Sequence, residues 1–177
     1  MTWTKNDIDF QTPDHVCDYM VSIAQPASVY LEPSPGAGNI VRAIKKRYPI
    51  ADVVTPEGDF LKMEPRGGPR CTVIMNPPFT PMKYGYQHLM HAMKFSQNIV
   101  ALLPMFILIN SIKRTSLLFS CKLNEVILLP RTVFRNTRIQ TALFVFSVDQ
   151  PVMDVTLSYY DPSKKMTSFA HPPGRQK

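Results

Sequence analysis

The chain has 177 residues, of which 45% are hydrophobic, and a formal net charge of +7. This length suffices for one domain with a substantial core, so we expect one catalytic domain over residues 1–160 and a basic, loosely ordered tail over 161–177. The excess of Lys and Arg favours a polyanionic partner, with nucleic acid as the first candidate.

Cysteine spacing and hydropathy exclude several other classes of protein. The three cysteines, Cys17, Cys71 and Cys121, lie far apart and form neither a disulfide framework nor a zinc-binding pattern. A reducing compartment fits best, so we expect a cytoplasmic protein. The longest apolar run, 99–109, is interrupted by Pro104 and is too short to span a bilayer, so we expect no membrane location.

The first part of the chain alternates between helix and strand patterns. Thr12 is placed to cap a helix that begins at Pro13 and that Pro26 ends. Residues 29–31 form a short strand pattern, and a turn leads from it into a second helical pattern that Pro49 closes. Strand, turn and helix in this order present backbone N–H groups and a helix N-terminus to a ligand.

The turn between them has the sequence Glu32-Pro33-Ser34-Pro35-Gly36-Ala37-Gly38. Gly36 and Gly38 allow φ values that other residues resist, and they let a ligand approach the main chain closely. Glu32 adds a negative charge that repels a pyrophosphate and suits a ligand with a cationic end. S-adenosylmethionine, which has an ammonium and a sulfonium group, is such a ligand. The alternative is an ordinary tight turn, because Gly-x-Gly is a weak signal by itself.

A second motif follows the apolar run 71–75, which predicts a buried strand. In Asn76-Pro77-Pro78-Phe79 each proline fixes its own φ and holds the preceding residue extended, so the chain leaves the strand as a stiff hook. The hook offers mainly acceptors, namely the Asn76 carbonyl and the backbone carbonyls around Pro77, with the aromatic face of Phe79 beside them. This suits a flat ring with an exocyclic amine, such as a base taken out of a duplex. The alternative is a Pro-rich turn with Phe79 in the core.

The second half of the chain continues the alternation. A helical stripe follows the hook, residues 98–103 form a strand pattern, Ser111 is placed to cap a helix, and residues 125–129 and 142–148 form two more strand patterns. Strands that alternate with helices predict an α/β sheet of mostly parallel strands, with ligands beyond their carboxyl ends. His88 and His91 share a helical face without a nearby acid or Cys pattern, so we expect no metal site.

The stretch between the last two strands is the best candidate for nucleic-acid binding. Arg131, Arg135 and Arg138 surround Phe134, a composition that fits phosphate contacts together with stacking or wedging at a base step. The alternative is a solvated hairpin tip with Phe134 packed inward.

Together these motifs resemble the class I S-adenosylmethionine-dependent amino-methyltransferases with an Asn-Pro-Pro-Phe/Tyr signature, and most closely the N6-adenine DNA methyltransferases. The resemblance extends from Phe10 to Val148 with the motifs in the expected order. It implies a Rossmann-like sheet with a last antiparallel strand. It also implies cofactor contacts from Phe10-Gln11-Thr12-Pro13, the glycine turn including Glu32 and Pro33, Gly58-Asp59-Phe60-Leu61 and Asn76, and a catalytic hook at Asn76-Pro77-Pro78-Phe79.

Two departures from the family pattern are visible. Residues 52–61 have to supply both the ribose-binding acid, either Glu57 or Asp59, and the adenine-contacting segment, so we expect a sheet shortened by one edge strand. The chain also lacks an insertion large enough for a target-recognition domain, so sequence selectivity would need loops or a protein partner.

The expected reaction is methyl transfer from S-adenosylmethionine to the N6 amine of adenine in DNA. Asn76 and the Pro77 carbonyl would accept hydrogen bonds from the amine and favour its nucleophilic geometry. An RNA adenine or guanine methyltransferase would use the same hook. Protein glutamine methylation, because a carboxamide also donates twice, and an inactive cofactor-binding subunit remain further alternatives.

Overall fold

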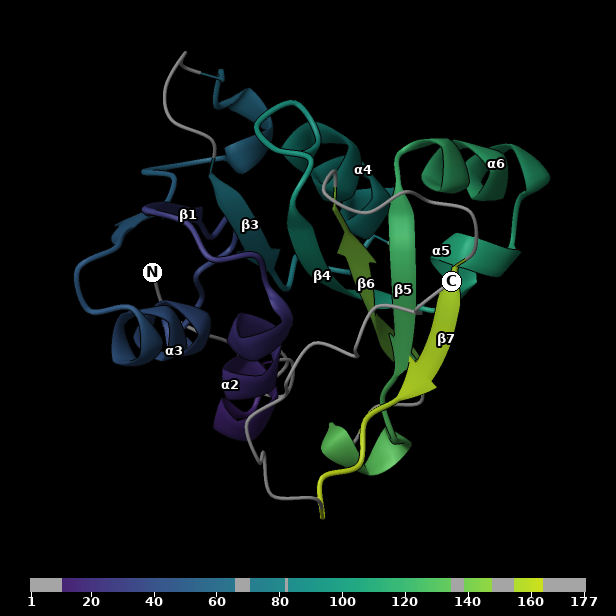
Figure 1. The fold of residues 1–177 in the computed structure, drawn as a ribbon. Coiled ribbons are helices and arrows are strands. Elements are labelled where there is room, and N and C mark those ends of the chain that lie inside the picture. Colours follow the sequence, from purple (N-terminus) through teal and green to yellow (C-terminus); the bar gives the residue numbers. More distant parts are fainter. Residues whose placement is uncertain (1–10, 66–70, 82, 135–138, 148–154, 164–177) are drawn as a thin grey trace, which may run out of the picture.

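The computed structural model describes residues 11–65, 71–81, 83–134, 139–147 and 155–163. They form a seven-stranded sheet in the order β2-β1-β3-β4-β6-β5-β7, with helices packed around it (Figure 1). The strands are β1 (Val29–Leu31), β2 (Asp52–Val54), β3 (Thr72–Met75), β4 (Ile99–Pro104), β5 (Leu123–Leu128), β6 (Thr141–Phe146) and β7 (Thr156–Tyr159).

The strand directions place the carboxyl ends of most strands at one edge of the sheet. β1, β2, β3 and β4 pair in parallel, β6 runs antiparallel between β4 and β5, and β7 pairs in parallel with β5. The carboxyl ends of six strands therefore meet at one edge, where β6 begins. The predicted α/β sheet, mostly parallel with one antiparallel strand, is confirmed, although the antiparallel strand is the last but one because β7 follows it.

The helices are α2 (Asp14–Ile23), α3 (Asn39–Arg47), α4 (Lys83–Ala92), α5 (Phe106–Ile109) and α6 (Ile112–Ser120), with short 3-10 helices η1 (Phe60–Lys62) and η2 (Arg131–Val133). α2 and α3 pack against each other on the side of β1, whereas α5 and α6 lie near β5 and β7 (Figure 1). Ser111 caps α6 as predicted, because its side chain accepts a hydrogen bond from the Arg114 N–H.

The centre of the sheet is the core of the domain. Every residue of β3 and β4 is buried, which explains why both strands, apart from Thr72 at the start of β3, have apolar sequences rather than an alternating pattern. Val16 and Met20 of α2 are also buried, as their helical spacing predicts. No helix among the described residues is long and apolar enough to cross a membrane.

The structure differs from the sequence prediction at two places. α2 begins at Asp14, with Pro13 at the N-cap position and no side-chain cap, so the prediction of Thr12 as the helix cap is wrong. The hydroxyl of Thr12 instead accepts a hydrogen bond from the Asn76 side chain. β7 was not predicted, because its four residues lie in a mostly polar stretch and pair with β5 far away in the sequence.

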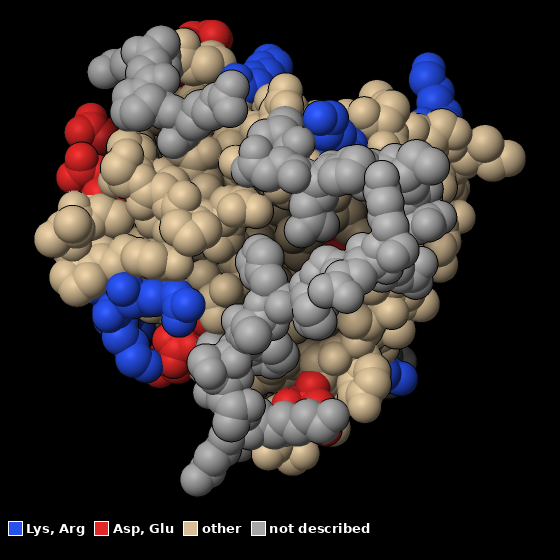
Figure 2. Space-filling model, viewed as in Figure 1, with Lys and Arg blue, Asp and Glu red and all other residues tan. Residues whose placement is uncertain are grey.

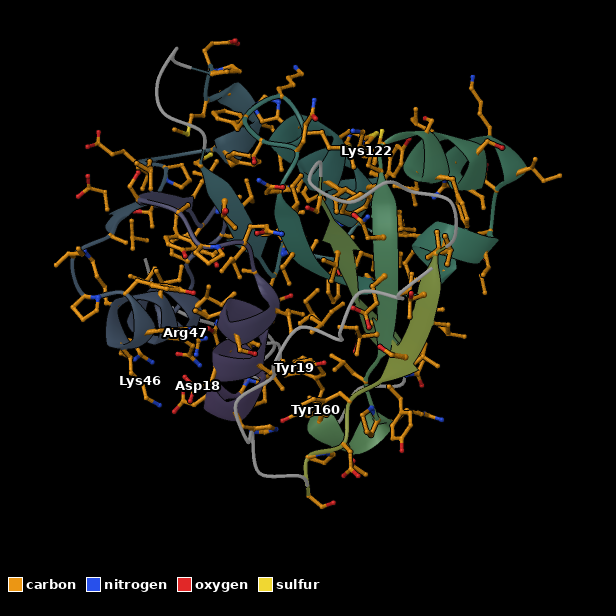
Figure 3. The ribbon with its side chains drawn as sticks, in the orientation of Figure 1. Asp18, Tyr19, Lys46, Arg47, Lys122 and Tyr160 are labelled. Atoms are coloured by element: carbon orange, nitrogen blue, oxygen red, sulfur yellow. The ribbon has the colours of Figure 1, made fainter. Side chains whose placement is uncertain are left out.

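Two further predictions concern the edges of the sheet, namely the missing edge strand and the C-terminal tail. β2 is an edge strand, and among the described residues no strand lies beyond it, in agreement with a shortened sheet. At the opposite side, Tyr160 follows β7 and lies beside Tyr19 of α2, with 4.9 Å between the ring centroids (Figure 3). Residues 164–177 of the predicted tail lie outside the described residues.

Candidate active site

The glycine turn follows β1 and begins with a buried acid. The Glu32 side chain is fully buried, and its Oε1 atom accepts a hydrogen bond of 2.8 Å from the Ser34 N–H. Its Oε2 atom is buried and has no hydrogen-bond partner among the described residues. Burial raises the pKa of this carboxyl group to about 8, and the Ser34 N–H opposes the shift. A buried oxygen without a partner at the end of a parallel strand is suited to a cationic ligand group.

Both glycines of the turn adopt conformations that disfavour side chains. Gly36 has φ +51° and Gly38 has φ +80°, both in the left-handed region. A Cβ atom on Gly36 would lie 2.9 Å from Gln11 Oε1, the end of a flexible side chain that can move, so the left-handed φ is the main reason for glycine at this position. That this turn holds S-adenosylmethionine rather than a diphosphate stays a prediction.

The segment Gln11–Thr12 connects the glycine turn to the hook. Gln11 Oε1 accepts a hydrogen bond of 3.1 Å from the Ala37 N–H, and the Thr12 carbonyl accepts one of 2.7 Å from Asn39 Nδ2. The Thr12 hydroxyl accepts a third bond of 2.9 Å from Asn76 Nδ2. Three predicted segments that are distant in sequence therefore meet in space. Phe10, which precedes them, lies outside the described residues.

The hook leaves the carboxyl end of β3. Asn76 is half-buried, Pro77 is buried and Pro78 is exposed. The Phe79 side chain is 9% exposed and lies in the hydrophobic core near Gly85 of α4. Its ring therefore occupies the core position of the alternative prediction, and its stacking role remains a proposal.

The segment predicted to contact the adenine of the cofactor lies before β3. Glu57 and Asp59 are exposed, and Asp59 caps η1 by accepting a hydrogen bond of 3.0 Å from the Leu61 N–H. The Phe60 ring is buried beside His91 of α4, with 4.9 Å between the ring centroids. His91 Nε2 also lies 2.9 Å from the Met63 carbonyl oxygen. Both observations assign a packing role to His91, and no group of residues suited to a metal ion occurs in the described part of the chain.

The candidate nucleic-acid loop is only partly described. Arg131 is exposed in η2, whereas the Phe134 side chain is 7% exposed and belongs to the core. Arg135 and Arg138 lie outside the described residues. An inward Phe134 corresponds to the alternative that the sequence left open.

Basic side chains elsewhere are partly neutralised. Figure 2 shows Lys and Arg of the α3 region next to acidic side chains, and Lys46 Nζ lies 2.8 Å from Asp18 Oδ2 of α2 (Figure 3). Lys45 donates to the Ala51 carbonyl. This surface therefore joins α2 to α3 and offers a polyanion fewer unpaired charges than its sequence suggests.

Asn39 is a site residue that the sequence reasoning did not identify, and the contact of Gln11 with the glycine turn is a role that it did not assign. The sequence predicts Gln11 only as part of a cofactor-contacting segment, because the residue has no charge or spacing that signals this contact. Asn39 is a polar residue at the start of α3, a position at which such a residue is common. Their contacts depend on chain segments that come together only in the fold.

Comparison with solved structures identifies proteins of the same fold. A methyltransferase subunit of a type I restriction-modification system from Streptococcus thermophilus matches with a TM-score of 0.62 and 18% identity, over 78% of this chain and 45% of that one. A protein of Listeria monocytogenes described as a class I S-adenosylmethionine-dependent methyltransferase matches with a TM-score of 0.64 and 16% identity, over 86% and 66% of the two chains. The M protein of the type I restriction enzyme EcoKI matches with a TM-score of 0.58 and 13% identity, over 79% and 44%.

Sequence comparison adds no closer relative. No protein-family model matches the chain, and no curated protein matches its sequence. The chain spans less than two thirds of the length of these three structural neighbours. The arrangement of the sheet and its similarity to these structures show that the chain has the fold of the class I S-adenosylmethionine-dependent methyltransferases.

Proposed function

We propose that this protein transfers a methyl group from S-adenosylmethionine to the N6 amine of adenine in DNA. The observation that supports the proposal most strongly is the meeting of the glycine turn and the hook at one edge of the sheet. Both are held by hydrogen bonds to Gln11 and Thr12. A methyl donor on the turn and an amine on the hook would then face each other across a short distance.

The glycine turn is the proposed cofactor site. Glu32 would receive the cationic end of the methionine part in its ionised form, and Gly36 and Gly38 would let the ligand approach the main chain. Glu57, Asp59 and the backbone around Phe60 would contact the nucleoside part, as the resemblance implies. When bound, S-adenosylmethionine would supply the methyl group from its sulfonium: an N–C bond to the amine would replace the S–C bond, and the methylated nitrogen would lose its proton to water.

The hook is the proposed target site. The amine of adenine is a weak nucleophile because its lone pair is delocalised into the ring. Hydrogen bonds from both amine hydrogens to the Asn76 side-chain carbonyl and the Pro77 backbone carbonyl would favour a pyramidal nitrogen. Because alignment of nitrogen, methyl and sulfur lowers the barrier, positioning of this kind contributes about 7–11 kcal/mol in favourable cases. Phe79 would stack on the base after a movement of its ring out of the core.

The preference for DNA is supported by charge and by the structural neighbours. The chain has a net charge of +7, and two of the neighbours belong to type I restriction-modification systems. The chain covers 45% of the Streptococcus thermophilus neighbour, so we propose that target recognition uses a further protein or segment.

The test measures binding and transfer separately. Titration calorimetry with S-adenosylmethionine tests the cofactor site, and transfer of a tritiated methyl group to double-stranded DNA, single-stranded DNA, RNA and protein extract tests the substrate. We expect label in DNA, recovered as N6-methyladenine after nucleoside analysis. Label only in RNA or only in protein would exclude the DNA assignment. Cofactor binding without transfer to any substrate would instead indicate an inactive cofactor-binding subunit.

A further inference from the structure

Thr12 contacts the two halves of the site through different atoms. Its main-chain carbonyl accepts the hydrogen bond from Asn39 Nδ2 at 2.7 Å, next to the glycine turn. Its hydroxyl accepts the bond from Asn76 Nδ2 at 2.9 Å, in the hook. The Thr12 residue is 3% exposed, so water does not compete for these contacts. The sequence resemblance implies only a cofactor contact for this residue, and these bonds point to a different role.

The main chain of Thr12 is held by a chain of hydrogen bonds in which each donor and acceptor can be identified. The Arg42 guanidinium can only donate, and it lies 2.5 Å from Asn39 Oδ1. The Asn39 amide nitrogen is therefore the atom that faces Thr12, whose carbonyl oxygen can only accept. This chain of bonds holds Thr12 in place independently of its side chain.

The Asn76 amide lies with its Nδ2 atom towards the Thr12 hydroxyl, which is the acceptor in this arrangement. When Asn76 Nδ2 donates to Thr12, Asn76 Oδ1 lies on the opposite branch of the amide and is directed away from Thr12. The reverse orientation would turn an NH2 group towards a target NH2 group, and two donors cannot form a hydrogen bond with each other. The orientation of this amide therefore decides whether the hook can accept from an amine.

We propose that Thr12 is a positioning residue that orients the Asn76 carbonyl for methyl transfer. The inference rests on the proposed function, because the orientation of Asn76 matters for catalysis only if an amine binds at the hook. Thr12 acts through Asn76 and does not itself touch the reacting atoms. Loss of its hydroxyl should therefore slow transfer and leave the cofactor bound.

Two variants separate the hydroxyl of Thr12 from its shape. Thr12→Val keeps the β-branched shape and replaces the hydroxyl with a methyl group, whereas Thr12→Ser keeps the hydroxyl. Side-chain amide signals of asparagine in 15N-labelled protein report on the hydrogen bonds directly, without substrate or cofactor. Asn76→Asp and Asn39→Asp variants assign the two signals, because each removes one amide.

We expect the Asn76 amide signals to shift in Thr12→Val and to stay in place in Thr12→Ser. The Asn39 amide bonds to the Thr12 main chain, so its signals should stay in place in both variants and serve as an internal control. Unchanged Asn76 signals in Thr12→Val would overturn the proposal. A joint shift of the Asn39 and Asn76 signals would also overturn it, because it would mean that the whole segment moves.

Transfer kinetics give the second readout. At saturating cofactor and DNA we expect kcat of Thr12→Val to fall about fivefold to tenfold, which corresponds to one hydrogen bond, with the cofactor Kd unchanged within about twofold. Thr12→Ser should restore kcat. A raised cofactor Kd with unchanged kcat would show that Thr12 is a cofactor contact alone and would overturn the inference. If the wild-type protein transfers no methyl group, the proposed function fails, and the amide signals still decide whether Thr12 holds Asn76.

Discussion

Two regions lie at the edge of the sheet where the carboxyl ends of six strands meet, and they differ in which groups are buried. Where β1 and β3 end, the buried groups are polar: Glu32 is fully enclosed, and Thr12 bonds to both the turn side and the hook. Where β5 ends and β6 begins, the charged Arg131 is exposed and the aromatic ring of Phe134 is buried. Buried polar groups depend on fixed geometry, whereas exposed charges act over a distance and are screened by salt.

This difference suggests that the region near β1 and β3 carries out methyl transfer and that the region near β5 and β6 contributes affinity for DNA. The region near β1 and β3 has the precise contacts that a reaction needs, and changes there should have large effects on single steps. The region near β5 and β6 can add electrostatic affinity for a polyanion, and changes there should have small, salt-dependent effects. The following variants test this division in order of decreasing effect.

Removal of the Asn76 carbonyl should have the largest effect. We expect Asn76→Ala to lower kcat about 100-fold, because it removes a hydrogen bond that is strongest in the transition state, with little change in cofactor Kd. Asn98→Ala makes the same substitution before β4, at the opposite edge of the sheet, and should retain most of the activity. Normal turnover of Asn76→Ala on the true substrate, measured under single-turnover conditions, would remove the hook from the mechanism.

The buried carboxyl group should make cofactor binding depend on pH. Burial raises the pKa of Glu32 to about 8, so the group is neutral below that pH in the free protein. A cationic ligand binds the ionised form, so binding below the pKa must release a proton. Affinity should therefore rise with pH up to about 8 and level off above it.

Glu32→Gln removes this ionisation and should flatten the pH profile, with about tenfold lower affinity at the plateau. Calorimetry in buffers of different ionisation enthalpy measures both the affinity and the proton release. Glu64→Gln changes an exposed acid and should leave the profile as it is in the wild type. A wild-type affinity that does not vary with pH would mean that Glu32 does not meet the cation.

The glycine turn should be sensitive to a single methyl group. Gly36→Ala places a Cβ 2.9 Å from Gln11 Oε1 at φ +51°, so we expect a loss of about 1–2 kcal/mol in the free energy of unfolding. Gly58→Ala is a matched control, because apart from its chain neighbours no atom of the described residues lies within 4 Å of its Cβ position, and it should change the free energy by less than about 0.5 kcal/mol. Urea denaturation measures both. Equal stability of the two variants would show that the turn does not require the left-handed conformation of Gly36.

The sequence predicts six of the seven strands, all but β7, because their local patterns agree with their environment in the fold. The run Thr72–Met75 is buried throughout and apolar after Thr72, and the hook and the glycine turn follow their strands directly. The contact between Thr12 and Asn76 could not be predicted, because it joins residues 64 positions apart through side chains that have many possible partners. A capping role for Thr12 was the local alternative, and the long-range bond prevailed.

The orientation of Phe134, after β5, was also hard to predict, because it depends on contacts that form only in the fold. The pattern around Phe134 fits a hairpin tip in which the ring points either outward or inward. Only the packing of Val133 and Phe134 into the core decides between them for the described residues. Similarly, β7 has exposed Leu157 and Tyr159 and gains its place in the sheet from pairing with β5.

Removal of Arg131 should have the smallest effect and tests the attraction assigned to the region near β5 and β6. We expect Arg131→Ala to weaken DNA binding about twofold to fivefold and to lower the slope of log Kd against log salt by about one, with kcat unchanged at saturating DNA. Lys46→Ala removes the same charge from a side chain that already pairs with Asp18 at 2.8 Å, so it should change the slope less. Fluorescence anisotropy with labelled duplex DNA over a range of salt concentrations measures both slopes. If the two variants lose equal affinity, the basic charge acts through the overall field of the protein. The assignment of catalysis to the region near β1 and β3 and of DNA binding to the region near β5 and β6 would then be wrong.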